Sequence, residues 1–74
     1  MKIFVTGGCG FIGSNFIIQQ ITKENNTILN YDKLTYAGNI NNLSSIEINQ
    51  KYEFVKGDIT DFKTLKNTIF DFEP

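Results

Sequence analysis

The chain has 74 residues, a formal net charge of −1 and no histidine, and its seven basic residues are all lysine. Without a basic excess, neither nucleic acid nor an acidic membrane surface is an expected partner. Cys9 is the single cysteine, so an internal disulfide bond and a zinc site of the usual Cys/His kind are excluded. Glycines interrupt the apolar N-terminus, and no apolar run reaches the ~18 residues of a membrane span, so we expect a cytoplasmic protein.

The first half of the chain predicts a strand, a helix and a second strand. Residues Lys2–Thr6 are rich in β-branched and aromatic side chains, which favour a buried strand. From Phe11 to about Thr22 the apolar residues recur near a 3.6-residue period, which predicts a helix. They are Ile12, Phe16, Ile17 and Ile21. Residues Thr27–Tyr31 predict the second strand, which Asp32 closes.

The second half predicts a short helix, a third strand and a third helix. An asparagine-rich stretch, residues 38–50, is typical of a loop with a short helix, and Tyr52–Val55 predict a strand. The last helix begins with a capping residue, Thr60 or Asp61. Its apolar positions have amphipathic spacing: Phe62, Leu65, Ile69 and Phe70.

This alternation of strands and helices predicts an α/β fold with a parallel sheet, because parallel strands need crossover connections. Right-handed crossovers place the strands in the order 3-2-1. This is the N-terminal half of a Rossmann-like doubly wound sheet, in which the first strand has neighbours on both sides. We therefore expect residues 1–74 to be a partial Rossmann domain, truncated before strand 4.

The segment TGGCGFIG follows the first strand and opens the first helix, and its glycines are spaced by three at Gly7, Gly10 and Gly13. The first N–H groups of a helix have no internal partner, and the helix dipole is positive there. We predict that Gly7 makes the turn, Gly10 lets a pyrophosphate approach the backbone, and Gly13 lets the helix lie near the strand. The alternative is a tight turn whose extra glycines serve only packing.

Asp32 stands 19 residues after Gly13, at the end of the second strand. A carboxylate at that place can accept hydrogen bonds from the ribose hydroxyls of an adenosine. It would repel a 2′-phosphate, and the chain has no arginine to offset this, so the charges favour NAD over NADP; Lys33 is the counter-argument. The alternative is that Asp32 is a turn residue at a strand end.

Asp58 and Ile59 follow the third strand in the same way and could border the adenine. The simpler interpretation of Asp58 is a loop aspartate before a helix. Cys9 lies near a helix N-terminus, which tends to lower the pKa of a thiol, but its simplest interpretation is a small residue in a crowded loop.

Residues Tyr52–Lys56 match the Y-x-x-x-K spacing of the catalytic pair in short-chain dehydrogenases. That chemistry needs the two side chains close together, as they are on one face of a helix. On a strand, four residues advance about 13 Å. Because YEFVK is typical of a strand, we predict that this pair is not catalytic.

Three segments, KIFVTGGCGFIGSNF, YDKLTYAGNINNL and YEFVKGDI, resemble the dTDP-glucose 4,6-dehydratases of the extended short-chain dehydrogenase/reductase family. DKLTYAGN and GDI are the more discriminating parts. The resemblance implies a homodimeric enzyme that acts on dTDP-glucose. Bound NAD would take hydride from C4 of the sugar, water would leave across C5 and C6, and the hydride would return at C6.

The resemblance also implies which residues bind the cofactor. The pyrophosphate loop comprises Phe11 and Ile12 with the three glycines, the adenosine ribose is bound by Asp32, Lys33, Leu34 and Thr35, and the adenine lies by Asp58 and Ile59. Residues 36–38 belong to the matching loop. The family's catalytic residues fall beyond position 74, so we assign none, and we expect the 74 residues alone to be inactive.

Two alternatives stay open at this point. One is an NAD-dependent epimerase or decarboxylase of the same family, acting on a UDP sugar. The other is a nucleotide-binding fragment without catalysis.

Overall fold

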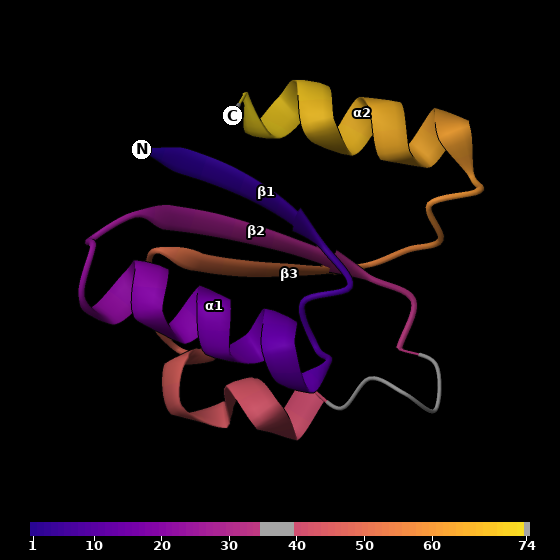
Figure 1. Ribbon diagram of the computed structural model, residues 1–74. Helices are drawn as coiled ribbons and strands as arrows, with labels where there is room; N and C mark the ends of the chain where they lie inside the picture. The colour runs from indigo at the N-terminus through magenta and orange to yellow at the C-terminus, as the bar shows by residue number, and fades with distance from the viewer. Residues whose placement is uncertain (35–39, 74) are drawn as a thin grey trace.

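A computed structural model describes residues 1–34 and 40–73, with side chains described at 1–34 and 42–73 (Figure 1). The elements, in chain order, are β1 (Lys2–Thr6), α1 (Phe11–Thr22), β2 (Thr27–Asp32), the 3₁₀ helix η1 (Ile40–Ile46), β3 (Tyr52–Lys56) and α2 (Phe62–Phe72). The predicted order of strands and helices is confirmed, and β2 and β3 are each one residue longer than expected. Within the described residues, no helix is long and apolar enough to cross a membrane.

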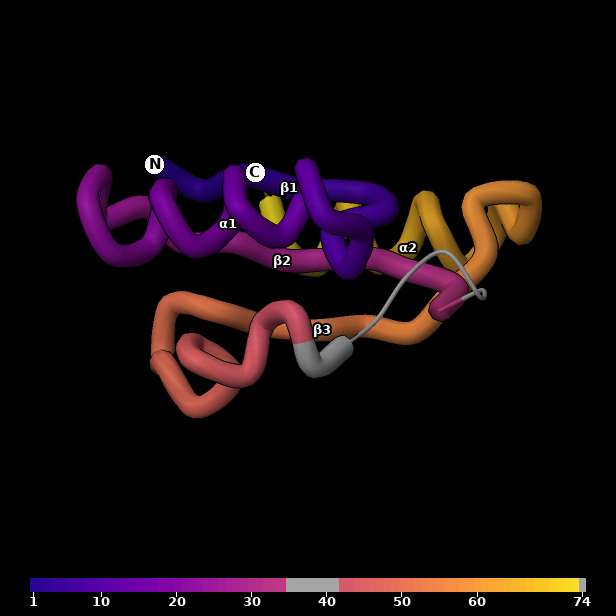
Figure 2. Tube along the Cα trace, turned by 60° about the horizontal axis from the view of Figure 1, so that its bottom comes forward, coloured from indigo at the N-terminus to yellow at the C-terminus, as the bar shows by residue number. Residues whose placement is uncertain are grey.

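The three strands are parallel and pair in the order β1-β2-β3, which is 3-2-1 when read from β3. Thr6 lies opposite Tyr31, and Asp32 lies opposite Lys56, so the carboxyl ends of all three strands share one edge. Helices α1 and η1 cover one face of this sheet and α2 lies over the other (Figures 1 and 2). The α/β class with a parallel sheet is therefore confirmed.

The central strand β2 is buried on both faces, as expected for a strand that has neighbours on each side and helices above and below. Successive side chains alternate between the faces. Ile28 packs with the α1 side of the core, and Leu29 and Tyr31 pack on the α2 side. The cluster on the α1 side comprises Cys9, Ile17, Ile21, Ile28, Leu43 and Ile46.

Helix α1 forms where predicted, but its buried face is narrower than the apolar spacing implied. Ile17 and Ile21 are buried with Ser14. Ile12 is 83% exposed and Phe16 is 42% exposed, so these two residues face away from the sheet. The periodicity therefore predicted the helix correctly but placed too many residues in its buried face.

Helix α2 begins at its expected cap. The Asp61 side chain accepts hydrogen bonds from the backbone N–H and the hydroxyl of Thr64. Its predicted apolar face is mostly exposed: Phe62 and Phe70 are each 77% exposed, and Leu65 is partly buried. The residue that anchors the helix is Phe72, which is buried against the sheet and which the sequence did not single out.

The Tyr52–Lys56 segment is strand β3, as predicted. The Tyr52 hydroxyl accepts a hydrogen bond from Asn30 Nδ2 at 3.2 Å, and burial raises its pKa. A catalytic tyrosine of that motif needs a neighbouring lysine that lowers its pKa. Tyr52 and Lys56 are therefore residues of a strand and not a catalytic pair.

Candidate functional site

The predicted turn at Gly7 is confirmed by a backbone φ of +69°, in the left-handed region that glycine tolerates. Gly7 N donates to the carbonyl of Tyr31 at 3.1 Å, which ties the end of β1 to β2. A Cβ added to Gly7 would meet no atom of the described residues within 4 Å, so these residues leave the space beside it open. The turn requires glycine for its conformation, and it leaves room for a ligand.

The other glycines of the loop differ in what surrounds them. A Cβ on Gly13 would lie 2.9 Å from the carbonyl oxygen of Gly7, so this glycine lets α1 approach the loop backbone. A Cβ on Gly8 would lie 2.4 Å from Asn30 Oδ1. At Gly10 the nearest atom would be 3.7 Å away, an ordinary contact. Gly8 and Gly13 thus serve packing, whereas Gly10 leaves its surroundings open, and the packing role of Gly8 was missed because it falls outside the spacing by three.

The start of α1 has free backbone donors. Gly10 is the N-cap residue, and no side chain among the described residues caps the helix. The first helical hydrogen bond runs from Ser14 N to Gly10 O at 2.8 Å. The N–H groups of Phe11, Ile12 and Gly13 come before it, so they have no acceptor within the helix. Together with the helix dipole, these donors make a site that favours an anion.

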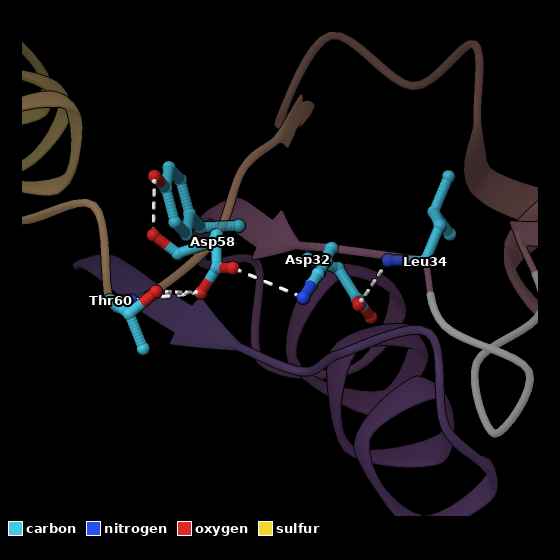
Figure 3. A network of polar contacts seen from close by, with 6 residues as sticks. Asp32, Leu34, Asp58 and Thr60 are labelled. Carbon is cyan, nitrogen blue, oxygen red and sulfur yellow. Dashed lines mark hydrogen bonds and ion pairs between the residues drawn. The ribbon is translucent and has the colours of Figure 1, made fainter.

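Asp32 lies at the carboxyl end of β2, and it is only 8% exposed. Its Oδ2 accepts a hydrogen bond from Cys9 N at 2.8 Å. Its Oδ1 accepts one from Leu34 N at 2.9 Å (Figure 3). Each carboxylate oxygen can accept a further hydrogen bond. Asp32 is therefore a turn residue and a support of the glycine loop, and it keeps acceptor capacity toward a ligand.

Leu34 adopts a φ of +59°, which is unusual for a residue with a branched side chain. This conformation costs about 1–2 kcal/mol. The hydrogen bond to Asp32 and the packing of Leu34 against the α1-side core offset that cost. The sequence pattern contained no signal for this strained position, which lies within the predicted ribose segment.

Cys9 is completely buried, and desolvation together with the neighbouring Asp32 raises the pKa of its thiol to about 11. The expectation that the helix N-terminus lowers this pKa is therefore wrong, because burial outweighs the dipole. A thiol with this pKa is not a nucleophile at neutral pH. Cys9 is a structural residue in a crowded loop.

Asp58 forms an ion pair with Lys33, with 3.1 Å between Oδ2 and Nζ. Its Oδ1 also accepts hydrogen bonds from Thr60 N at 2.9 Å and from the Thr60 hydroxyl at 2.8 Å (Figure 3). The bonds from Thr60, followed by Lys33, lower the pKa of Asp58 to about 2. Asp58 is thus ionised at neutral pH, and it holds the cation of the residue that follows Asp32.

A groove of about 220 Å³ opens at the carboxyl edge of the sheet. It brings together five of the predicted site residues: Gly7, Asp32, Lys33, Asp58 and Ile59. Tyr31, Gly57 and Thr6 complete its lining, and sequence reasoning had not named them. The remaining predicted residues do not line this groove. Four of them lie at the start of α1, namely Gly10, Phe11, Ile12 and Gly13, and Leu34 comes directly after the lining residue Lys33 in the chain. Thr35 and residues 36–38 lie outside the described residues.

A larger hollow, of about 460 Å³, lies under α2 and is lined by residues that include Lys2, Thr27 and Phe72. Lys2 and Thr27 are the first residues of their strands. Ligands of open parallel sheets bind at the opposite, carboxyl ends of the strands. The smaller groove is therefore the candidate site.

The family model described as GDP-mannose 4,6 dehydratase matches residues 4–74. The chain belongs to this family. A dTDP-glucose 4,6-dehydratase of Escherichia coli is 45% identical over 74 residues, which are all of this chain and 20% of that protein. The chain spans about a fifth of the length of the curated relatives that it matches.

Solved structures of similar proteins agree with this membership. A dTDP-glucose 4,6-dehydratase of Bacillus anthracis in complex with NAD has a TM-score of 0.92 and 46% identity, over 99% of this chain and 24% of that one. A UDP-glucuronic acid 4-epimerase of Bacillus cereus in complex with UDP-glucuronic acid and NAD has a TM-score of 0.80 and 28% identity, over 96% of this chain and 24% of that one. The predicted resemblance to dTDP-glucose 4,6-dehydratases is confirmed.

Proposed function

We propose that residues 1–74 are the NAD-binding segment of a dTDP-glucose 4,6-dehydratase. The observation that carries the proposal is the convergence of three features at one edge of the sheet. These are the open turn at Gly7, the uncapped start of α1 and the buried carboxylate of Asp32. Relatives that match the whole chain include dTDP-glucose 4,6-dehydratases, and a solved dTDP-glucose 4,6-dehydratase that matches 99% of the chain is in complex with NAD.

The described residues fit NAD. The backbone N–H groups at Phe11, Ile12 and Gly13 would hold the pyrophosphate, because no described side chain competes for them and Gly10 leaves the approach open. The carboxylate of Asp32 would accept the ribose hydroxyls. The groove beside Asp58 and Ile59 would take the adenine. When bound, NAD supplies a reversible hydride acceptor.

The same geometry favours NAD over NADP. The Asp32 carboxylate would repel a 2′-phosphate, and Lys33 is the nearest candidate to offset it. The cation of Lys33 is already paired with Asp58 at 3.1 Å, so its charge is largely compensated. The ion pair therefore weakens the argument that Lys33 could neutralise the 2′-phosphate of NADP.

The finer architecture is part of the proposal. We place residues 1–74 as a partial Rossmann domain, with the order 3-2-1 continued by a fourth strand beside β1, as in the first half of a doubly wound sheet. The residues that protonate and dehydrate the sugar would belong to later segments, so the 74 residues alone would not turn over dTDP-glucose. The complete enzyme would be a cytoplasmic homodimer.

Calorimetric titration of the protein, expressed as the whole product of its gene, tests the cofactor. We expect NAD to bind more tightly than NADP, and Asp32→Asn to weaken NAD binding by about tenfold through loss of charge-assisted hydrogen bonds. Asp71→Asn, an exposed aspartate of α2, is the matched control and keeps the NAD affinity of the parent. Equal affinities of the Asp32→Asn variant and the parent would contradict the proposed ribose contact.

The second candidate is a UDP-sugar epimerase, which the likeness to the Bacillus cereus enzyme favours. Mass spectrometry of the product separates the two candidates, since dehydration of dTDP-glucose lowers the mass by one water and epimerisation of UDP-glucuronic acid leaves it unchanged. We expect the dehydrated product. Binding of NAD without either product would instead support a nucleotide-binding fragment.

A further inference from the structure

Three side chains form hydrogen bonds with the backbone of Gly8 and Cys9 in the glycine loop. Asn30 Oδ1 accepts from Gly8 N at 2.9 Å, and Asp32 Oδ2 accepts from Cys9 N at 2.8 Å. Asn42 Nδ2, from η1, donates to the carbonyl of Cys9 at 3.0 Å. Three successive peptide groups, from Gly7–Gly8 to Cys9–Gly10, are therefore fixed by side chains of β2 and η1.

Of these three side chains, Asn30 has the least freedom to move, because it is completely buried. Its Nδ2 donates to Cys9 Sγ at 3.4 Å and to the Tyr52 hydroxyl at 3.2 Å. These two contacts fix the orientation of the carboxamide, so that its oxygen faces Gly8 N. A rotated amide would place two donors against each other.

A buried carboxamide is costly unless it is fully hydrogen-bonded, and an apolar residue would pack in its place at lower cost. Ile28, two residues earlier on the same strand and on the same side of the core, is such a residue. The position of Asn30 directly under the loop indicates that its polar atoms serve the loop and not the core.

We propose that Asn30 is a positioning residue that sets the glycine loop in its ligand-ready shape before any ligand arrives, and that it acts together with Asp32 and Asn42. The inference rests on the proposed function in one respect, namely that this loop receives the cofactor pyrophosphate. A loop that is already ordered loses less conformational freedom on binding, which raises affinity. Asp32 would then link the two ends of the site, because one carboxylate oxygen holds Cys9 N while the carboxylate also faces the groove.

Affinity for NAD tests the role of Asn30 in the protein expressed from its whole gene. Asn30→Ala leaves Gly8 N unsatisfied, and we expect NAD affinity to fall by about tenfold or more. Ile28→Val is the control on the same strand and the same face, and it should keep NAD affinity within about twofold because it removes one methyl group and no hydrogen bond. Affinities are compared at a temperature where circular dichroism shows both variants folded.

Hydrogen exchange of the ligand-free protein tests the same inference without a cofactor. We expect the amides of Gly8 and Cys9 to be protected in the parent, and the amide of Gly8 to exchange about tenfold faster in Asn30→Ala. The strand amides of Ile28 and Leu29 should keep their protection. Equal exchange at Gly8 in the two proteins would overturn the positioning role, whatever the cofactor affinity.

A second variant keeps the test decisive if Asn30→Ala does not fold. Asn42 is exposed, so Asn42→Ala should fold, and we expect a loss of NAD affinity of about threefold with faster exchange at Cys9 and Gly10. Unchanged exchange and unchanged affinity in this variant would overturn the inference. Failure of the parent itself to bind NAD would overturn the proposed function, while the exchange comparison would still decide the role of Asn30.

Discussion

The two faces of the sheet are packed in different ways. On the α1 face, buried polar groups are interleaved with the core: Asn30 and Asp32 reach the glycine loop through side-chain hydrogen bonds. On the α2 face, the buried cluster consists of Leu29, Tyr31 and Phe72, with a hollow of about 460 Å³ beside it. The comparison shows that directional contacts are concentrated where the loop must have one shape, and that apolar packing suffices elsewhere.

The helices reflect the same difference. α1 and η1 both contribute buried residues to the α1-side core, whereas α2 buries Phe72 and leaves Phe62 and Phe70 exposed. Figure 2 shows α1 lying along the strands on its face of the sheet. The α1 face is therefore the more firmly built of the two, and the following predictions test that conclusion.

The largest expected effect comes from two neighbouring residues of β2 that point to opposite faces. Ile28→Ala should lower the free energy of unfolding by about 4 kcal/mol and Leu29→Ala by about 2–3 kcal/mol, within the range of buried truncations. Ile28 is enclosed, while Leu29 lines the hollow, where no new closed cavity forms. Urea unfolding measures both values, and an equal or larger loss for Leu29→Ala would reverse the comparison of the two faces.

The next effect separates the glycines that serve packing from the one that leaves space. Gly8→Ala should cost about 1–3 kcal/mol, because its Cβ would lie 2.4 Å from Asn30 Oδ1 and from Ile17 Cδ1, both in buried side chains. Gly10→Ala should change stability by less than about 0.5 kcal/mol.

Thermal unfolding measures these stability changes, and titration with NAD completes the test. We expect Gly10→Ala to bind NAD more weakly than the parent despite its native stability, since its methyl group would occupy the approach to the backbone. A stable Gly8→Ala variant would show that the loop is looser than the structure implies.

The smallest effect is the response of the α1 face to alkaline pH. Burial raises the pKa of Cys9 from 9.0 to about 11 in the folded state, so the folded protein keeps a proton that the unfolded chain loses. The associated stability is fully present below pH 9, and it decreases as the pH rises toward 11, by at most about 1.4 kcal/mol per pH unit.

Urea unfolding of Cys9→Ala and its parent between pH 8 and pH 10 measures this term as a difference. The pKa values of Tyr31 and Tyr52 are also raised, mainly by burial, and this effect is common to the two proteins. The smaller effect of the Cys9 charge on the pKa of Tyr52 disappears with the thiol and is part of the measured difference. Parallel pH profiles of the two proteins would mean that the thiol is not desolvated by folding.

Much of the fold could be predicted from local patterns. Short apolar runs marked the strands, the glycine spacing marked the turn at Gly7, and the pair Thr60 and Asp61 marked the start of α2, because each of these signals acts through neighbouring residues. The exposure of Ile12 and Phe16 could not be predicted, since periodicity states that a helix has an apolar face but not how much of that face a three-stranded sheet covers.

The candidate site was predictable to a similar degree. Asp32 and Asp58 were identified because strand ends of a parallel sheet meet at one edge. The ion pair of Asp58 with Lys33 and the contacts of Asn30 were not predictable. They join residues 25 and 22 positions apart, respectively, and depend on the register of neighbouring strands.

The sequence by itself determined the order of the elements, the parallel sheet, the glycine turn and the resemblance to sugar-nucleotide dehydratases. All of these are set by residue type and spacing along the chain. Only the tertiary structure decided that Cys9 is inert, that Gly8 is required for packing, and that Asn30 and Asp32 hold the loop. The physical reason is that burial and hydrogen-bond partners are properties of contacts across the sheet, and these exist only once β2 lies between its two neighbours.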